Sequence, residues 1–504
     1  MTISGISAAV SFAGLVAAGL YQINLTVPAG CRRVIMQYCD GGGSVFTDFS
    51  HPEDQLTEWL FFQLASNMGN VGFSFICSAH TAPPGETGVP IRFEKEAVLS
   101  YSKMQMDRRS WLRGVAAPAA LFALDAFKPA RTAQAAVGPN DRVKITKVES
   151  FVLKNSWVFV KISTDAGIVG WGEMLKDDAK ACAAGALEVA QYLVGQDPGR
   201  VAFHWQAIHR GAFYRGGPIK TAISSGIDQA LWDIKGKMFG VPVHVLMGGP
   251  TRDRVRVYGR VDKATGVNAM KTTLSVNGRG PSKYNEGQRY VDGAVEFFKD
   301  LRKRMGPDVD IGVEFHGAVQ PSTSISLMKA LEPHQPWFYE EVVQPLNVDV
   351  MAELARKTSV PLATGERIFT KWGFREILEK RAAMILQPDV CYAGGITELK
   401  IIAGMAEAYY TPLAPHNPQG PCSLAASLQI AASIPNFLIQ ERGDNEYPDL
   451  LAKPMPPVSK GHRPLLTEPG LGITIDENKL MAQVGEPRPY LTRFDADDGS
   501  VVDW

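Results

Sequence analysis

Short apolar runs that end on an ionisable residue recur through the second half of the chain. A clear example is the run that ends at Val313, which is followed by Glu314 and His316. Comparable runs end on Glu340, Glu366, Asp389, His416 and Glu441, at intervals of 23 to 27 residues. Each interval has room for one strand and one crossover helix, the connection that parallel strands require. The pattern therefore predicts an α/β fold with a (β/α) barrel, a modified TIM barrel, over residues 253–450.

A different pattern precedes the barrel. Between 143 and 174 apolar and polar residues alternate, and a turn at 165–167 separates two of the alternating segments. Such alternation is typical of an antiparallel meander. Helical periodicity follows at 179–193 and 220–239, so residues 143–252 are predicted to form an α+β domain. After 451 the chain becomes proline-rich and then supplies a last strand within 451–504.

The first part of the chain follows neither pattern. Residues 1–103 contain one strand-like alternation, at 21–27, and otherwise no sustained period, so their fold is unassigned. Residues 104–136 carry Arg108 and Arg109, an apolar stretch and a small-residue site at 133–135, in the order of a twin-arginine export signal.

Export signals act at the N-terminus of a protein. The natural start is therefore expected at Met104 or Met106, with the preceding residues an upstream extension. In that case the protein is periplasmic or otherwise exported. If residues 1–103 are instead a genuine extra domain, a cytoplasmic location is expected.

Charge and cysteine content narrow the partner class. Among 504 residues, 52 Lys and Arg balance 52 Asp and Glu, so no net field recruits nucleic acid or an acidic membrane surface. Gly and Ser interrupt the uncharged opening run, which therefore does not predict a stable membrane span. The six cysteines have no zinc or disulfide spacing. A small-molecule partner is predicted.

The ionisable strand ends predict a metal site. In a (β/α) barrel the carboxyl ends of the strands meet at one mouth, so Glu314, Glu340 and Glu366 are expected to converge. Three carboxylates without thiolates form an oxygen-rich site that suits a hard ion such as Mg²⁺.

Two histidines stand beside these carboxylates in the predicted mouth. His316 and His416 can each move a proton near neutral pH. Asp389, one strand before His416, can hydrogen-bond that imidazole and raise its basicity. Glu441 follows on the next strand and is placed to stabilise an enediolate. The set predicts acid and base chemistry at the mouth.

From about Val143 onward the chain resembles the enolase superfamily, and within it the mandelate racemase subgroup and its galactonate dehydratase branch. The strings that carry the resemblance are Phe-Tyr-Arg-Gly-Gly-Pro at 213–218, 226–236, Thr-Gly-Glu-Arg at 364–367, Gln-Pro-Asp at 387–389, 393–397 and Ala-Pro-His at 414–416. The resemblance implies that the α+β domain caps the barrel mouth and that the C-terminal tail returns to it. It also implies substrate contacts by Trp157 and Arg215, a lysine of the mouth at Lys271, and a homo-oligomer.

The reaction that the resemblance implies is Mg²⁺-dependent dehydration of a sugar acid. His416, with Asp389, would take the C2 proton to give a metal-stabilised enediolate. His316 would protonate the departing C3 hydroxyl, and the product would be a 2-keto-3-deoxy acid. The sequence does not specify which sugar acid is used.

Two alternatives remain open. One is a racemase or epimerase of a 2-hydroxy acid with bases on opposite faces, and the other is a catalytically impaired binding relative. The second is favoured by a first crossover of only eight residues, 262–269, where helix and loops normally need more. It is also favoured by Glu314 where relatives usually carry Asp, and by Val342 where they carry Pro.

Overall fold

The computed structural model describes residues 141–276, 287–442, 447–490, 492–495 and 498–503, together with the backbone of eight strands between residues 2 and 78. The chain divides into two compact units, Met1–Phe127 and Lys128–Trp504. Within the described residues, no helix has both the length and the apolar character that a membrane crossing requires. The signal-like segment at 104–136 lies outside the described residues, and its role stays a prediction.

The described part of the first unit consists of antiparallel strands. They are β1 (Thr2–Ile3), β2 (Ile6–Ser7), β3 (Val10–Ala17), β4 (Leu20–Leu25), β5 (Arg33–Asp40), β6 (Gly43–Ser50), β7 (Leu60–Ala65) and β8 (Gly72–Ser78). Two three-stranded sheets have the orders β3-β4-β7 and β6-β5-β8, and β1 pairs with β2. The strand that the alternation at 21–27 predicts is β4.

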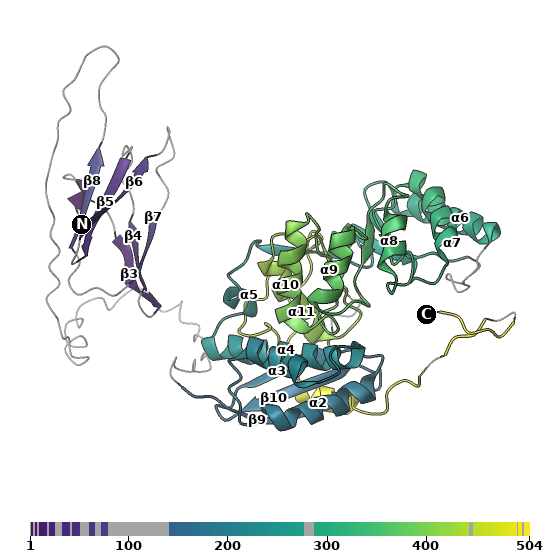
Figure 1. Ribbon diagram of the computed structural model, residues 1–504, viewed down its shortest axis with the longest axis horizontal. Coiled ribbons are helices and arrows are strands. Elements are labelled where there is room, and N and C mark those ends of the chain that lie inside the picture. The colour runs from purple at the N-terminus through teal and green to yellow at the C-terminus, as the bar shows by residue number, and fades with distance from the viewer. Residues whose placement is uncertain are drawn as a thin grey trace, which may run out of the picture. The chain divides into compact units, whose positions relative to one another are not determined.

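The second unit begins with the α+β domain, which we call the cap. Its elements are β9 (Ile145–Val152), β10 (Val158–Thr164), β11 (Val169–Met174), α2 (Ala179–Leu193), α3 (Val201–Gly211), α4 (Pro218–Phe239) and α5 (Val243–Leu246). The strands form the predicted antiparallel meander, in the order β11-β10-β9. Helix α4 lies between this meander and α10 of the barrel (Figure 1).

Two glycines allow α4 to pack directly on β11. A Cβ added at Gly172 would lie 1.9 Å from the carbonyl oxygen of Gly226, and one at Gly170 would lie 2.1 Å from that of Ala230. Real Cβ atoms do not come this close to backbone, so larger side chains would force the helix off the sheet. The close approach explains why α4 is buried along most of its length.

The barrel alternates strands with helices, as the spacing predicts. Its strands are β12 (Arg254–Tyr258), β13 (Ala269–Thr273), β14 (Asp310–Glu314), β15 (Tyr339–Glu340), β16 (Leu362–Thr364), β17 (Ile385–Leu386) and β18 (Gln440–Glu441). Its helices are α6 (Gln288–Met305), α7 (Pro321–Leu331) with the 3₁₀ turn η1 (Glu332–His334), α8 (Val348–Ala355), α9 (Thr370–Lys380), α10 (Gly395–Ala408) and α11 (Pro421–Ser433).

Hydrogen bonding around the barrel is continuous except at one place. Strands β13 to β17 form one parallel sheet, and bridges through Leu413 extend it to Phe437, just before β18. Strand β18 pairs in parallel with β12. Between β12 and β13 no ladder is present among the described residues, although the Gly259 N–H donates to the Ala269 carbonyl over 3.1 Å. The ladder is therefore open there.

The first crossover lacks a helix. Residues 259–268, which connect β12 to β13, contain an antiparallel bridge between Asp262 and Val267. The free edge of β12 pairs instead with β19 (His462–Pro464), a strand of the C-terminal tail. The shortened crossover expected from the sequence is thus present, and the tail occupies the edge that β13 would take in a closed sheet.

The C-terminal tail also contacts the cap. The Val243 N–H donates to the Gly470 carbonyl over 2.9 Å, and the Leu471 N–H donates to Asp233 Oδ1 over 2.9 Å. Farther on, α12 (Glu477–Gln483) places Glu477 2.7 Å from the Lys161 ammonium of β10. These contacts tie the C-terminal tail to α4, α5 and β10 of the cap.

Glu173, at the end of β11, joins the cap to the barrel. Its buried carboxylate accepts hydrogen bonds from the Gly420 N–H (2.5 Å) and the Ser423 N–H (3.1 Å), at the start of α11. These donors favour the ionised form, as helix N-termini do. Burial opposes ionisation more strongly and raises the pKa of Glu173 to about 8.

This pKa predicts a pH-dependent stability. Between the ordinary glutamate pKa and about 8, the folded state holds a proton that the unfolded chain has released. The free energy of unfolding should therefore fall as pH rises through this window, by up to about 1.4 kcal/mol per pH unit. Denaturant unfolding of Glu173→Gln should show a smaller decline than the parent protein. Equal declines in both proteins would contradict the assignment.

Candidate active site

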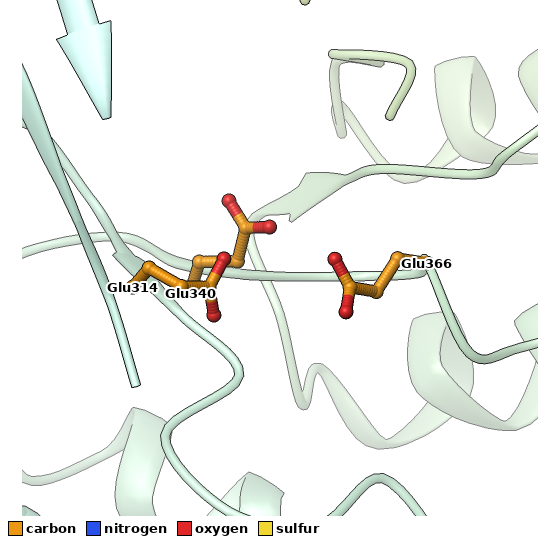
Figure 2. Close-up of side chains that lie close together, drawn as sticks. All are labelled: Glu314, Glu340 and Glu366. Carbon is orange, nitrogen blue, oxygen red and sulfur yellow. The ribbon is translucent and has the colours of Figure 1, made fainter. Parts of the chain in front are cut away.

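Three glutamates meet at the carboxyl ends of neighbouring strands. Glu314 ends β14 and lies in register with Glu340, which ends β15, while Glu366 follows β16 by two residues. One carboxylate oxygen from each residue lies within 4.8 Å of the other two. Figure 2 shows the carboxylates of Glu314 and Glu340 next to each other, with that of Glu366 pointing toward them. The structure thus brings together the three ligands that the spacing predicts.

The donor set fits a hard divalent cation. All three ligands are carboxylates, the ligand type that such ions prefer. Glu314 and Glu340 are 1% and 0% exposed, so their negative charges need positive partners close by.

Lys271 contributes a positive charge to the same cluster. From β13, its ammonium lies 2.7 Å from Glu340 Oε1, 3.1 Å from Glu314 Oε2 and 3.5 Å from Glu441 Oε1. Burial and the Glu314 carboxylate raise the pKa of Glu340 well above its usual value. Burial also opposes ionisation of Glu314, but the Lys271 ammonium lowers the pKa of that group. The predicted mouth lysine therefore sits among the carboxylates.

His416 lies between two carboxylates. Its Nδ1 is 2.9 Å from Asp389 Oδ2, and its Nε2 is 3.0 Å from Glu366 Oε2. The other Asp389 oxygen accepts the Cys391 N–H over 2.7 Å, which fixes the carboxylate. Burial opposes protonation of the imidazole, yet Glu366 and the neighbouring Glu441 raise the pKa of His416 well above its ordinary value. The predicted contact between His416 and Asp389 is present.

Glu441 and His316 complete the mouth. Glu441 accepts the Asn417 N–H over 2.8 Å and lies 4.0 Å from His416 Nε2. His316 follows β14, and its own N–H donates to Glu314 Oε1 over 2.8 Å. Its ring Nε2 is 3.9 Å from Glu314 Oε2, and its side chain is 38% exposed. One histidine therefore approaches the cluster beside Glu314 and the other beside Glu366.

The two predicted substrate contacts of the cap are not in contact with this cluster. Arg215 is exposed, in the loop between α3 and α4. Trp157 is half-buried, and its ring packs edge-on against Tyr447, with centroids 5.7 Å apart. The Tyr447 hydroxyl donates to the Gln419 carbonyl, three residues after His416. Trp157 thus reaches the His416 loop indirectly, and the substrate roles of both residues stay predictions.

Several residues without a predicted role also belong to the site. Gln387 donates to Glu340 Oε2 over 2.5 Å. Tyr258 is buried at the end of β12, and its pKa is raised well above normal by burial and by the negative charge of Glu441. Arg367 forms an ion pair with Glu341. Arg367 and Glu341 could have been found from the sequence by their positions, because each directly follows a predicted metal ligand.

Comparison with known protein families assigns both parts of the second unit. The model for the mandelate racemase / muconate lactonizing enzyme N-terminal domain matches residues 133–248, and the enolase C-terminal domain-like model matches residues 259–479. A D-galactonate dehydratase from Cronobacter sakazakii is 41% identical over 384 residues, which span 72% of this chain and 100% of that protein.

Solved structures show the same likeness. A member of the enolase superfamily from Salmonella Typhimurium matches with a TM-score of 0.64 and 31% identity, over 67% of this chain and 98% of that one. An enolase from Agrobacterium radiobacter, bound to sodium and L-malate, matches with a TM-score of 0.64 and 28% identity, over 71% of this chain and 99% of that one.

Proposed function

Since the chain belongs to the mandelate racemase and muconate lactonizing enzyme family of the enolase superfamily, and is a hydro-lyase of the sugar-acid dehydratase type, we propose that it removes water from a galactonate-like acid through the residues of the mouth. One observation carries this proposal. Two histidines flank one cluster of three carboxylates, and the more buried of them is held by Asp389. Dehydration needs such a pair, a base for one proton and an acid for the leaving hydroxyl.

Glu314, Glu340 and Glu366 would hold the metal ion, which we propose is Mg²⁺. Bound there, a divalent ion would offset the negative charge that develops on the substrate carboxylate when the neighbouring C–H bond breaks. Lys271 adds a second positive charge at the same place, because its ammonium already contacts Glu340 and Glu314.

His416 would remove the C2 proton in its neutral form, which a cation bound to Glu366 would favour by offsetting the carboxylate charge that raises the imidazole pKa. Asp389 accepts the Nδ1 hydrogen, orients the ring and stabilises its charged form. The electron pair of the C2–H bond would first delocalise into the substrate carboxylate, and in a second step it would form the C2–C3 double bond as the C3–O bond breaks. His316 would give its proton to the departing oxygen, which leaves as water, and the enol product becomes a 2-keto-3-deoxy acid.

A screen of six-carbon aldonic and aldaric acids tests the proposal. The purified full chain, supplied with Mg²⁺, should convert at least one of these acids to a product with a 2-keto group, detected with semicarbazide. A product that is only the C2 epimer of the substrate would instead establish a racemase or epimerase. Binding of an acid without turnover would establish a binding relative.

Removal of a predicted metal ligand should weaken metal binding. Glu340→Ala deprives a hard ion of one anionic oxygen, so Mg²⁺ affinity measured by calorimetry should fall more than about 100-fold, beyond the cost of losing a group that only supports a ligand. Glu314→Asp keeps a carboxylate and should be tolerated.

Glu407→Ala provides the matched control for Glu340→Ala, because Glu407 is exposed on α10. It should bind Mg²⁺ like the parent protein. Unchanged affinity in Glu340→Ala would remove the metal site as proposed.

A further inference from the structure

The backbone that carries His316 has an unusual conformation. His316 has φ 52° and the following Gly317 has φ 62°, so two consecutive residues occupy the left-handed region. Residues other than glycine rarely adopt this conformation, and they keep it when surrounding groups enforce it. Another non-glycine residue of this kind, Glu341 with φ 45°, lies just after the neighbouring strand β15.

Arg367 contacts both of these irregular segments. Its Nη2 donates to the His316 carbonyl over 3.0 Å. Its Nε and Nη2 donate to the two Glu341 carboxylate oxygens over 3.0 and 2.5 Å, a paired geometry that fixes the plane of the guanidinium. Its Nη1 donates to Gln344 Oε1 over 2.8 Å.

The backbone of Glu341 also contacts the segment that carries His316. Its carbonyl accepts the Gly317 N–H over 2.6 Å, so the residue after His316 is held as well. The Glu341 side chain is fully buried, whereas that of Arg367 is 32% exposed. A Cβ added at Gly317 would lie 2.9 Å from Arg367 Nη2 and 2.8 Å from the Gln344 nitrogen. The guanidinium therefore lies directly against the backbone at 317, where only glycine leaves room.

We infer that Arg367 is a positioning residue for His316: its guanidinium, oriented by Glu341, holds the His316 backbone in the conformation that directs the imidazole into the mouth. This inference rests on the proposed function, in which His316 protonates the leaving hydroxyl. Among the described residues, the Arg367 side chain forms hydrogen bonds with Glu341, Gln344 and the His316 carbonyl, and none with Lys271, Asp389 or His416. Arg367 therefore affects protonation of the leaving hydroxyl by His316, and removal of the C2 proton by His416 does not depend on it.

Two substitutions at Arg367 test this role. Arg367→Lys keeps the charge but cannot donate to Glu341, Gln344 and the His316 carbonyl in one plane. Arg367→Met removes all of the donors. Both should lower kcat for dehydration at least about tenfold, a part of the roughly 10²- to 10⁴-fold general-acid effect that misplacement of His316 would forfeit, with little change in KM. Exchange of the substrate C2 proton with deuterated solvent should stay within about twofold of the parent protein.

The double variant Arg367→Met with His316→Asn separates positioning from an independent contribution. If Arg367 acts through His316, the double variant should dehydrate no more slowly than His316→Asn alone. Arg375→Met is the matched control, because Arg375 is an exposed arginine on α9, paired only loosely with Glu379 at 3.7 Å. It should behave like the parent protein in every assay.

A second measurement does not depend on turnover. Hydrogen exchange monitored by mass spectrometry should show faster exchange of the 315–318 backbone in Arg367→Met than in Arg375→Met, with Mg²⁺ affinity unchanged. Unchanged backbone hydrogen exchange at 315–318 would overturn the inference, even if the protein dehydrates no acid. A parallel loss of C2 exchange and dehydration, or an additive loss in the double variant, would also overturn it. Absence of turnover in the parent protein, with faster backbone exchange in Arg367→Met, would count against the proposed function and leave the positioning intact.

Discussion

His416→Asn should abolish both dehydration and exchange of the C2 proton. Asparagine keeps an amide near Asp389 but has no group that accepts a proton near neutral pH. Both reactions begin with removal of the same proton. Each rate should therefore fall at least about 100-fold, the lower end of the roughly 10²- to 10⁴-fold range of general acid–base effects. The 2-keto product is measured chemically, and C2 exchange is followed by proton NMR in deuterated water.

Mg²⁺ affinity is the control for this substitution, since His416 contacts the predicted ligand Glu366. The affinity should change much less than in Glu340→Ala. His334→Asn, in the 3₁₀ turn η1, provides a matched histidine substitution away from the mouth. If His416→Asn retains C2 exchange at the parent rate, another group removes the proton and the proposed base is wrong.

The sequence was enough to predict the carboxylate cluster because it depends on a single repeated feature. Glu314 and Glu340 end neighbouring parallel strands, and Glu366 stands two residues beyond a third. Strand ends meet at one mouth whatever the details of the helices, so the interval between ionisable residues was sufficient. The contact of His416 with Asp389 follows from the same rule, applied to the next pair of strand ends.

The Arg367 arrangement could not be predicted in this way. Adjacent residues near a strand end point in different directions, so Glu340 faces the cluster while Glu341 faces Arg367. Which residue Glu341 meets depends on the backbone irregularity at His316 and on the loop that carries Gln344. Neither feature leaves a periodic signal in the sequence.

The open position in the barrel was predicted only in part. The short segment before β13 indicated a missing helix, and the structure has an antiparallel bridge there. The pairing of β19 with β12 had no local signal, because it joins residues about 200 positions apart in the chain. The direct packing of α4 on Gly170 and Gly172 was missed for the same reason, since a glycine in a strand does not reveal which backbone approaches it.

His316→Asn should separate the two halves of the reaction. His416 and its Asp389 partner remain, so the C2 proton can still leave and return, and C2 exchange should persist near the parent rate. Departure of the hydroxyl loses its proton donor, so dehydration should fall by roughly 10²- to 10⁴-fold. Exchange without product would show that the two histidines act in separate steps. If exchange instead disappears in His316→Asn and persists in His416→Asn, the roles of base and acid are reversed. If neither substitution alters turnover, proton transfer in this reaction uses neither histidine, and the proposed mechanism is wrong.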